Sequence, residues 1–456
     1  MSAQTTYLFQ ASLRPVPKIV SGKGVHVTVA DKITGELKDL IDANSGAAVS
    51  SIAHGDEEIK QKMREAVENQ FYTFPLIARN EPSEKLAKFI IDESKGAFAT
   101  ALFTGSGSES VENALKIMYK YHLENGEPQR TKFISRKQSY HGYTLGCLSI
   151  ADNSRRAEYK DILLPAEQTI KVSNPYPYRN QKEDETPDQY TARLLAELEE
   201  AFQAAGPETV VGFVAETVGG STFGCQTPPP GYLDGCRDIC HKYGALFYLD
   251  EVMCGCGRMG ALHAWTKYMT GPGPDIQTNG KTLGAGYVTI AAVLVGHKIM
   301  DLFKAKGSFV EGAQTYHNHA FNCEVALAVQ EKVKREKLIE NIDVVGAYLG
   351  EQLRAVDSKF IGNVRGAGGF WGVEFVKDKA TKEPFEVSYN FYGKFFQKFY
   401  DNGVWSLTGA GSIDGNLGVH TVFSPAFSIT KEEVDEIIVR FKKTMAELED
   451  EYDASL

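Results

Sequence analysis

The chain has 456 residues, of which 43% are hydrophobic and 24% are charged, a composition that excludes a disordered or collagen-like protein. At roughly 150 residues per domain, this length predicts two or three structural units. The 49 basic and 59 acidic side chains give a net charge of −10. This balance argues against nucleic acid or an anionic membrane surface as the main partner, and we expect neither.

The cysteines and the N-terminus set the expected compartment. Seven cysteines are an odd number for a disulfide framework. Cys236 and Cys240 are four residues apart, Cys254 and Cys256 are separated by one residue, and neither spacing is a zinc pattern. The first twenty residues lack the charged-then-apolar layout of a signal peptide, and no apolar run is long enough to span a membrane. We therefore expect a cytoplasmic protein with reduced thiols and no metal.

Helix-like and strand-like segments alternate through the middle of the chain. Helical periodicity or charge patterning marks the segments at 57–71, from about 110 onward, 189–204 and 231–243. Short apolar runs mark strands at 97–103, 210–215, 245–249 and 288–295. Strands separated by crossover helices predict an α/β domain with a mostly parallel sheet.

The two ends of the chain differ from the middle. Residues 1–55 consist of strand and turn fragments, whereas residues beyond about 325 alternate helices with short strands. Thr430 and Glu433 form a capping-box pair that starts the last helix. That helix is expected to bury Val434, Ile437, Ile438, Phe441 and Met445. We predict a large domain at 56–324 and a smaller α+β domain built from 1–55 and 325–456, with a surface loop at 174–188.

A Gly/Ser-rich turn lies between the strand that ends at Phe103 and the following helix, in the order Thr104-Gly105-Ser106-Gly107-Ser108-Glu109. Small residues let backbone N–H groups approach an anion, and a helix N-terminus adds its positive dipole end. A dinucleotide fingerprint requires a glycine where Ser110 stands. The turn is thus either a phosphate-binding turn or a plain connector.

Tyr140 begins the segment YHGYTLG, in which Gly142 and Gly146 follow closely. An aromatic side chain beside such a turn can stack on a flat ring, and it can equally fill a gap in the core.

Two residues at strand ends suggest a specific chemistry in combination. Asp250 ends the apolar run ALFYL, and the carboxyl ends of parallel strands face the crevice where such folds bind ligands. Lys281 follows 31 residues later in the glycine-rich, otherwise uncharged segment NGKTLGAGY. A confined lysine has a lowered pKa and can act as a nucleophilic amine. An imine-forming lysine, a carboxylate and a phosphate-binding turn are what pyridoxal phosphate needs.

The chain resembles the class III (omega-type) aminotransferases of fold type I from about Gly22 to the C-terminal helix. The resemblance rests on the segments FTGSGSESVENALK, SYHGYTLGCLS, ETVGGSTFGCQTPPPGYL, LDEVMCGCGRMGALHAW, DIQTNGKTLGAGY, EGAQTYHNHAFNCEVALAVQ and VRGAGGFWGVEFVKD. It implies pyridoxal 5'-phosphate as cofactor, a cofactor-binding large domain, a small domain from both termini, and a homodimer with active sites at the subunit interface.

The resemblance also implies roles for individual residues. Lys281 matches the Schiff-base lysine and proton shuttle, and Asp250 matches the partner of the pyridine nitrogen. Val252 and Tyr140 would cover the two faces of the ring. The remaining matches are Gly107 and Ser108 for the phosphate turn, Thr315 for the phosphate contact made by the neighbouring subunit, and Glu216 for a glutamate near the ring.

Departures from the family pattern concern the substrate. The loop at 317–322 and Asn279 differ from the usual residues, and residues 366–439 contain no arginine. Many relatives place a carboxylate-binding arginine just before the stretch that corresponds to 422–425. His420 lies near that position here, and it cannot copy the bidentate grip of an arginine. A substrate carboxylate is then held elsewhere, for which Arg79 is one candidate, or one substrate lacks a carboxylate.

The leading hypothesis is transfer of an amino group between an amine or amino acid and a keto acid or aldehyde. A second hypothesis keeps the fold and the cofactor but assigns a different reaction, that of a racemase, aminomutase, decarboxylase or carbon–heteroatom lyase. A NAD-dependent dehydrogenase would explain the α/β alternation but leave Lys281 and Asp250 without a role. A non-catalytic binding protein would leave the imine-forming lysine unexplained.

Overall fold

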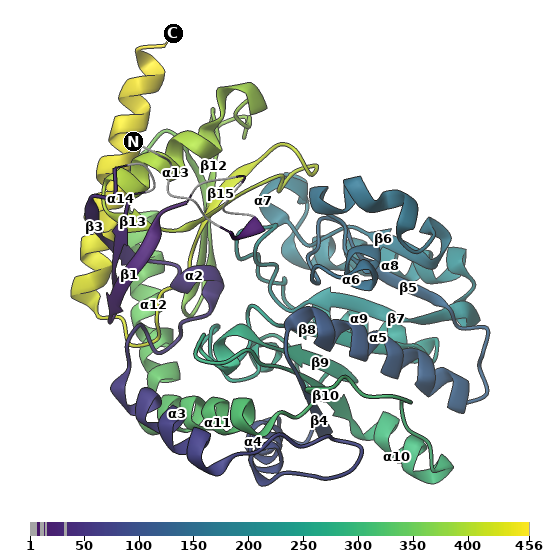
Figure 1. The fold of residues 1–456 in the computed structure, drawn as a ribbon. Helices are drawn as coiled ribbons and strands as arrows, with labels where there is room; N and C mark the ends of the chain where they lie inside the picture. The colour runs from purple at the N-terminus through teal and green to yellow at the C-terminus, as the bar shows by residue number, and fades with distance from the viewer. Residues whose placement is uncertain (1–6, 10–12, 14–15, 32–33, 456) are drawn as a thin grey trace.

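The computed structural model describes residues 7–9, 13, 16–31 and 34–455, so parts of the predicted 1–55 segment lie outside the described residues. A seven-stranded sheet forms its centre (Figure 1). From one edge to the other, its strands are β4 (Phe98–Thr104), β10 (Ala291–Gly296), β9 (Ile276–Asn279), β8 (Leu246–Glu251), β7 (Val210–Glu216), β5 (Lys132–Arg136) and β6 (Thr169–Val172).

The central sheet is mostly parallel, as the alternation of helices and strands predicts. Strands β9, β8, β7, β5 and β6 pair in parallel, and only β10 runs antiparallel to its neighbours β9 and β4. Strands β7, β8 and β10 are buried along their whole length. Their continuous apolar character reflects a sheet that is covered on both faces.

Helices cover both faces of this sheet. On one face, α5 (Gly107–Glu124), α6 (Leu145–Ile150) and α10 (His297–Lys306) share a core with alternate residues of the strands. On the other face, α8 (Pro187–Ala205) and α9 (Tyr232–Lys242) pack on β5, β7 and β8. Helices α4 (Glu81–Asp92) and α11 (Ala320–Arg335) cover the β4–β10 edge. The result is a three-layer α/β/α arrangement.

Two four-stranded sheets lie beside the central layers. The first has the order β1 (Lys18–Lys23), β2 (His26–Ala30), β3 (Leu37–Asp42) and β13 (Val404–Trp405). The second has the order β11 (Ile361–Ala367), β12 (Phe370–Phe375), β15 (Val419–Phe423) and β14 (Leu407–Ala410). The remaining α-helices are α2 (Ser45–Ala48), α3 (Glu57–Asn69), α7 (Pro177–Asn180), α12 (Leu338–Arg354), α13 (Phe391–Asp401) and α14 (Lys431–Asp453).

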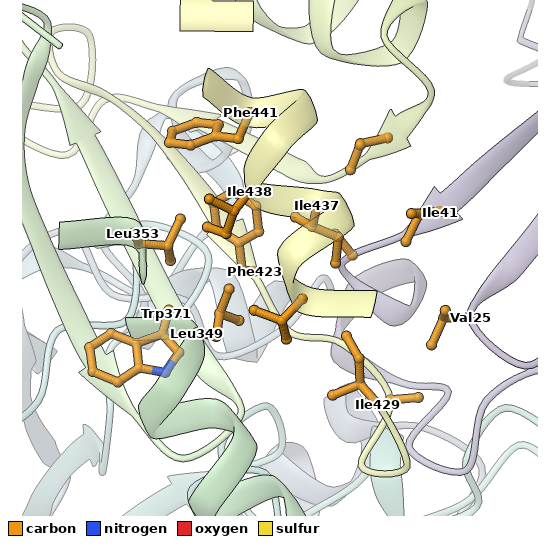
Figure 2. Packing of buried hydrophobic residues seen from close by; sticks show 14 of the residues in the cluster. Val25, Ile41, Leu349, Leu353, Trp371, Phe423, Ile429, Ile437, Ile438 and Phe441 are labelled. Atoms are coloured by element: carbon orange, nitrogen blue, oxygen red, sulfur yellow. The ribbon is translucent and has the colours of Figure 1, made fainter. Parts of the chain in front are cut away.

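One apolar core joins the N-terminal strands to the C-terminal elements. Val25 and Ile41 share this core with Ile437, Ile438 and other residues of α14 (Figure 2). Figure 1 shows the purple N-terminal strands beside the yellow helix α14. Helix α14 has the predicted capping box and buries all five predicted residues. The domain boundaries themselves stay a prediction, because α3 and α11 also contribute to this core.

The expectation of a surface loop at 174–188 is wrong in its first half. Tyr176 is 2% exposed, and its hydroxyl donates to the carboxylate of Glu374 in β12. The short helix α7 follows, and Arg179 Nε donates to the same carboxylate at 2.6 Å. The polar, proline-rich composition predicts a loop. The first half of the segment is nevertheless buried, because Tyr176 contacts Glu374, some 200 residues away in the sequence.

Within the described residues, no helix has the length and apolar character needed to cross a membrane. The same residues contain no cluster of three or more His, Cys, Asp or Glu side chains that suits a metal ion. All seven cysteines are free and buried.

Replacing Phe441 with alanine tests the shared core. Phe441 is completely buried in α14, so the cavity left behind is expected to lower the free energy of unfolding by about 3–5 kcal/mol. Val439 lies on the same helix and is 66% exposed, so Val439→Ala is the matched control, with an expected change below about 0.5 kcal/mol. Urea unfolding followed by tryptophan fluorescence measures both. Equal midpoints for the two variants would contradict this description of the core.

Candidate active site

A cavity of about 520 Å³ opens where the carboxyl ends of β7, β8 and β9 meet the N-terminus of α5. This is the end of a parallel sheet at which ligands bind, and the volume suits a small-molecule ligand. Seven of the eight residues predicted as site residues line the cavity: Gly107, Ser108, Tyr140, Glu216, Asp250, Val252 and Lys281.

Asp250 is held by three hydrogen-bond donors. Its Oδ2 lies 2.8 Å from His141 Nδ1, and its Oδ1 accepts hydrogen bonds from Thr278 Oγ1 and from the backbone N–H of Val252, both at 3.0 Å. The side chain is 5% exposed. Donors on both oxygens satisfy the buried carboxyl group and fix its orientation in the cavity.

The β-strand register explains how these groups come together. Asp250 in β8 pairs directly with Glu216 in β7 and with Thr278 in β9. The three side chains therefore stand in a row across neighbouring parallel strands, on the same side of the sheet.

Sequence reasoning missed two members of this arrangement, His141 and Thr278. His141 follows Tyr140 in the quoted YHG segment, is 2% exposed, and has an Nε2 atom without a protein partner among the described residues. Thr278 lies three residues before Lys281 in β9, a short strand that was not predicted from the sequence. Its contact with Asp250 depends on strand register.

Lys281 begins the single turn that follows β9, with a positive φ of 46°. Burial lowers the pKa of its amine to about 8, and the nearby carboxylates of Asp250 and Glu216 partly oppose that shift. An amine with this pKa is neutral in a large fraction of molecules near pH 8, and a neutral amine is a nucleophile.

Val252 forms one wall of the cavity between two glycines. A Cβ atom on Gly107 would lie 2.7 Å from Val252 Cγ1, and one on Gly280 would lie 3.2 Å from the same atom. The backbone at position 107 therefore lies so close to Val252 that only glycine, which has no Cβ atom, fits there. This contact brings the N-terminus of α5 up to the segment that contains Lys281.

The N-terminus of α5 forms one end of the cavity. Ser106 is the N-cap and accepts a hydrogen bond from the N–H of Glu109 at 3.2 Å. The N–H groups of the first helical residues, Gly107 and Ser108, have no acceptor within the helix, so they can bind an anion. Ser108 Oγ accepts a hydrogen bond from the N–H of Tyr143 at 2.9 Å, which ties the turn to the YHG segment.

Tyr140 and Glu216 are linked to each other. The backbone N–H of Tyr140 donates to Glu216 Oε1 at 3.2 Å, and that of Gly220 donates to Oε2 at 3.2 Å. Glu216 is 5% exposed, and its burial raises the pKa of the carboxyl group. In the described part of the chain, no lysine or arginine side chain forms an ion pair with it.

Thr315 is the eighth predicted residue, and it does not line the cavity of its own chain. It is exposed, and its carbonyl accepts a hydrogen bond from Tyr72 Oη at 3.0 Å. The unusual loop that follows is bound to the edge of the sheet, because Asn318 exchanges two hydrogen bonds with Phe103, each 2.9 Å long.

Arg79 and His420, which were considered for a substrate carboxylate, do not line this cavity, and neither does Asn279, which departs from the family pattern. Arg79 is exposed and lies 3.5 Å from Glu84. His420 is fully buried in β15, and burial lowers its pKa to about 4, so it carries no charge near neutral pH. Asn279 is fully buried in β9, where its Oδ1 accepts a hydrogen bond from Gln277.

The donor set fits pyridoxal phosphate. An ionised aspartate suits a protonated pyridine nitrogen, the free N–H groups of α5 suit a phosphate, and a valine and a tyrosine suit the faces of a flat ring. The cradle at Gly107 and the orphaned His141 Nε2 leave room and polar capacity for a ligand.

Comparison with known proteins decides the family. The model for aminotransferase class-III matches residues 12–445. The chain belongs to the class III aminotransferases. An uncharacterized aminotransferase of Schizosaccharomyces pombe is 42% identical over 97% of this chain and 96% of its own. A diaminobutyrate–2-oxoglutarate transaminase of Halomonas elongata is 30% identical over 95% of this chain and 90% of its own.

A solved structure supports the same assignment. An (S)-enantioselective omega-transaminase from Thermomicrobium roseum superposes with a TM-score of 0.86 at 31% identity, over 97% of this chain and 95% of that one. This aminotransferase therefore has the predicted fold type I, depends on pyridoxal 5'-phosphate, and transfers amino groups.

Replacing Gly107 with alanine is expected to weaken cofactor binding. The new Cβ overlaps Val252 Cγ1 and pushes the N-terminus of α5 away from the cavity. We expect at least a tenfold rise in the dissociation constant for pyridoxal phosphate, measured by fluorescence quenching. The double variant Gly107→Ala/Val252→Ala removes the overlapping atoms and is expected to recover part of the affinity. Unchanged affinity in the single variant would show that this contact does not position the helix.

Proposed function

We propose that the aminotransferase moves amino groups through Lys281, with Asp250 as the partner of the pyridine nitrogen. The observation that carries this assignment is the shared cavity: Lys281, with a lowered pKa, faces the same space as an aspartate held by three donors. Pyridoxal phosphate, when bound, supplies an aldehyde that takes up the substrate amine and a ring that accepts the electrons of the broken C–H bond.

Lys281 has two tasks in this proposal. With pyridoxal phosphate bound, the amine would hold the cofactor covalently in the resting enzyme. Once freed by the substrate amine, the neutral Nζ would accept a proton from the substrate carbon and donate it again to complete the transfer. Its lowered pKa suits both tasks, because a general base works best when its pKa lies near the working pH.

Asp250 would hold the pyridine nitrogen of the bound cofactor and would favour a proton on it. His141 and Thr278 hold the carboxyl group of Asp250 in place. Val252 and Tyr140 are assigned to the two faces of the ring, and the N–H groups of Gly107 and Ser108 to the phosphate. We assign Glu216 to the ring's surroundings through its contact with the Tyr140 backbone.

The substrates are an amine or amino acid and a keto acid or aldehyde. The name of the Halomonas relative pairs an amino acid that carries a second amino group with a keto dicarboxylate. Class III membership favours amino-group transfer over the racemase, aminomutase, decarboxylase, lyase and dehydrogenase alternatives.

We also propose a homodimer with shared active sites. Thr315 is exposed and lies outside the cavity of its own chain, as a residue assigned to the neighbouring subunit's cofactor phosphate must be. The division into a cofactor-binding domain at 56–324 and a split domain at 1–55 and 325–456 belongs to this proposal. So does a cytoplasmic location, for which seven free, buried thiols are the support.

The proposed reaction is tested by its first half. Incubation of the holoenzyme with a panel of amines and amino acids is expected to convert the absorbance of the pyridoxal form to that of the pyridoxamine form with at least one donor. Lys281→Ala is expected to show no conversion above background. A Lys281→Ala variant that turns over at the wild-type rate would overturn the assignment.

The pH dependence of cofactor attachment follows from the pKa of Lys281. Only the neutral amine attacks the aldehyde, so the attachment rate to the apoenzyme is expected to rise with pH and to level off above about pH 8. An ordinary lysine would continue to gain rate up to about pH 10.5. Stopped-flow absorbance measures this rate. Pyridoxamine phosphate, which has no aldehyde, is the control ligand, and its binding is expected to lack this rise.

A further inference from the structure

A second, smaller pocket lies beside the cofactor cavity. It has a volume of about 70 Å³, enough for a carboxylate group or two water molecules. Its lining residues are Gln138, Asn153, Ser154, Arg155, Ser221, Thr222, Gly409, Ala410, Gly411 and Gly415. No aspartate or glutamate is among them, and the one charged side chain is that of Arg155.

The two cavities share two walls. In the segment 138–142, Gln138 lines the small pocket while Tyr140 lines the large one. In the segment 216–222, Glu216 lines the large cavity while Thr222 lines the small one. Among the residues that the structure describes, none lines both cavities, but Arg155 of the small pocket lies 5.1 Å from the ring centre of Tyr140, so the two cavities are neighbours at Tyr140.

Arg155 is positioned and has free donors. Its backbone N–H donates to Asn153 Oδ1 at 3.1 Å, and its guanidinium carbon lies 5.1 Å from the centre of the Tyr140 ring. Within the described residues, its side chain forms neither an ion pair nor a hydrogen bond. A guanidinium stacked on an aromatic ring keeps its edge available for two parallel hydrogen bonds to a carboxylate.

Thr222 adds an independent indication of a ligand. It is 8% exposed, and its Oγ1 has no hydrogen-bond partner in the part of the chain that the structure describes. A buried hydroxyl without a partner costs free energy unless something fills the site. Thr222 and Arg155 line the same pocket. Thr222 Oγ1 has almost no accessible surface, so its hydroxyl would rotate toward a carboxylate that binds to Arg155.

The charged residues of the large cavity also favour binding of a distal carboxylate in the small pocket. Glu216 and Asp250 contribute two carboxylates to the large cavity, against one lysine and no arginine. Among the described residues, the lining of the large cavity therefore has no guanidinium for a distal carboxylate, whereas Arg155 offers one in the small pocket. A carboxylate bonded directly to the reacting carbon must stay near Lys281, whereas none of the residues around Lys281 lines the small pocket. The small pocket therefore suits a carboxylate several bonds from the reacting carbon.

We propose that Arg155 and Thr222 bind the distal carboxylate of the substrate and select for amino donors and keto acids that carry one. This inference rests on the proposed function, because it places the reacting carbon at Lys281. It assigns the carboxylate to a residue outside the arginine-free stretch 366–439, and to neither Arg79 nor His420.

The test is the binding of glutarate, an unreactive five-carbon dicarboxylate, to the enzyme loaded with pyridoxamine phosphate. Isothermal titration calorimetry is expected to show binding to the wild type, weakened by about 10- to 100-fold in Arg155→Met and less in Arg155→Lys and Thr222→Val. Lys160→Met removes an exposed charge from the same segment and is expected to bind glutarate as the wild type does. Glutaramide, the uncharged diamide of the same length, has no carboxylate and is expected to bind equally weakly to all variants.

Turnover measurements distinguish the proposed carboxylate pocket from the proposed function on which it rests. With a keto dicarboxylate acceptor, Arg155→Met is expected to raise KM by about the same factor with little change in kcat, while an aldehyde acceptor shows no change. No glutarate binding to the wild type, or equal binding to Arg155→Met, would overturn the assignment of the pocket. Absence of amino transfer by the wild type with every pair would refute the proposed function, and the glutarate measurement would still decide the role of Arg155.

Discussion

The three hydrogen bonds that hold Asp250 are the interaction on which the rest of the site depends. Burying a carboxyl group that is only 5% exposed costs free energy unless its oxygens are hydrogen-bonded. The N–H of Val252 just after β8, Thr278 in β9 and His141 in the YHG segment supply those hydrogen bonds. The hydrogen bond between His141 and Asp250 also links strand β8 to the segment that contains Tyr140. Because His141 is bound to Asp250, the neighbouring Tyr140 has a defined place from which it can cover a ring.

The parallel sheet turns this local arrangement into a site. Its register aligns Glu216, Asp250 and Thr278 at the carboxyl ends of adjacent strands, and the turn after β9 brings Lys281 into the same space. Desolvation then acts differently on the two kinds of group. It lowers the pKa of Lys281, which makes the amine reactive, whereas the donors around Asp250 offset the cost of burying its charge. An amine with a lowered pKa and a fully hydrogen-bonded aspartate therefore share one cavity.

Much of this was predictable from the sequence because chemistry-bearing residues lie at the ends of strongly patterned strands. The alternation of strands and helices and the capping box of α14 follow from such patterns, as do the candidates Gly107, Ser108, Tyr140, Asp250 and Lys281. Val252 and Glu216 came only from the resemblance to the class III aminotransferases. Contacts across the fold were not predictable. The burial of Tyr176 depends on Glu374, and the contact of Thr278 with Asp250 depends on register. The direction of β10 is equally hidden, because a buried strand has the same composition in either direction. The Arg155 pocket combines three segments that are far apart in the chain.

The central claim is that the ionised carboxylate of Asp250 drives the chemistry that Lys281 carries out. The most direct test is the single-turnover rate of the amino-donor half-reaction in Asp250→Asn, saturated with cofactor and followed by stopped-flow absorbance. Asparagine keeps the size of the side chain but removes the charge that favours a proton on the pyridine nitrogen. We expect the rate of Asp250→Asn to be at least about 100-fold lower than that of the wild type, with the cofactor still bound. A rate within twofold of the wild type would contradict the central claim.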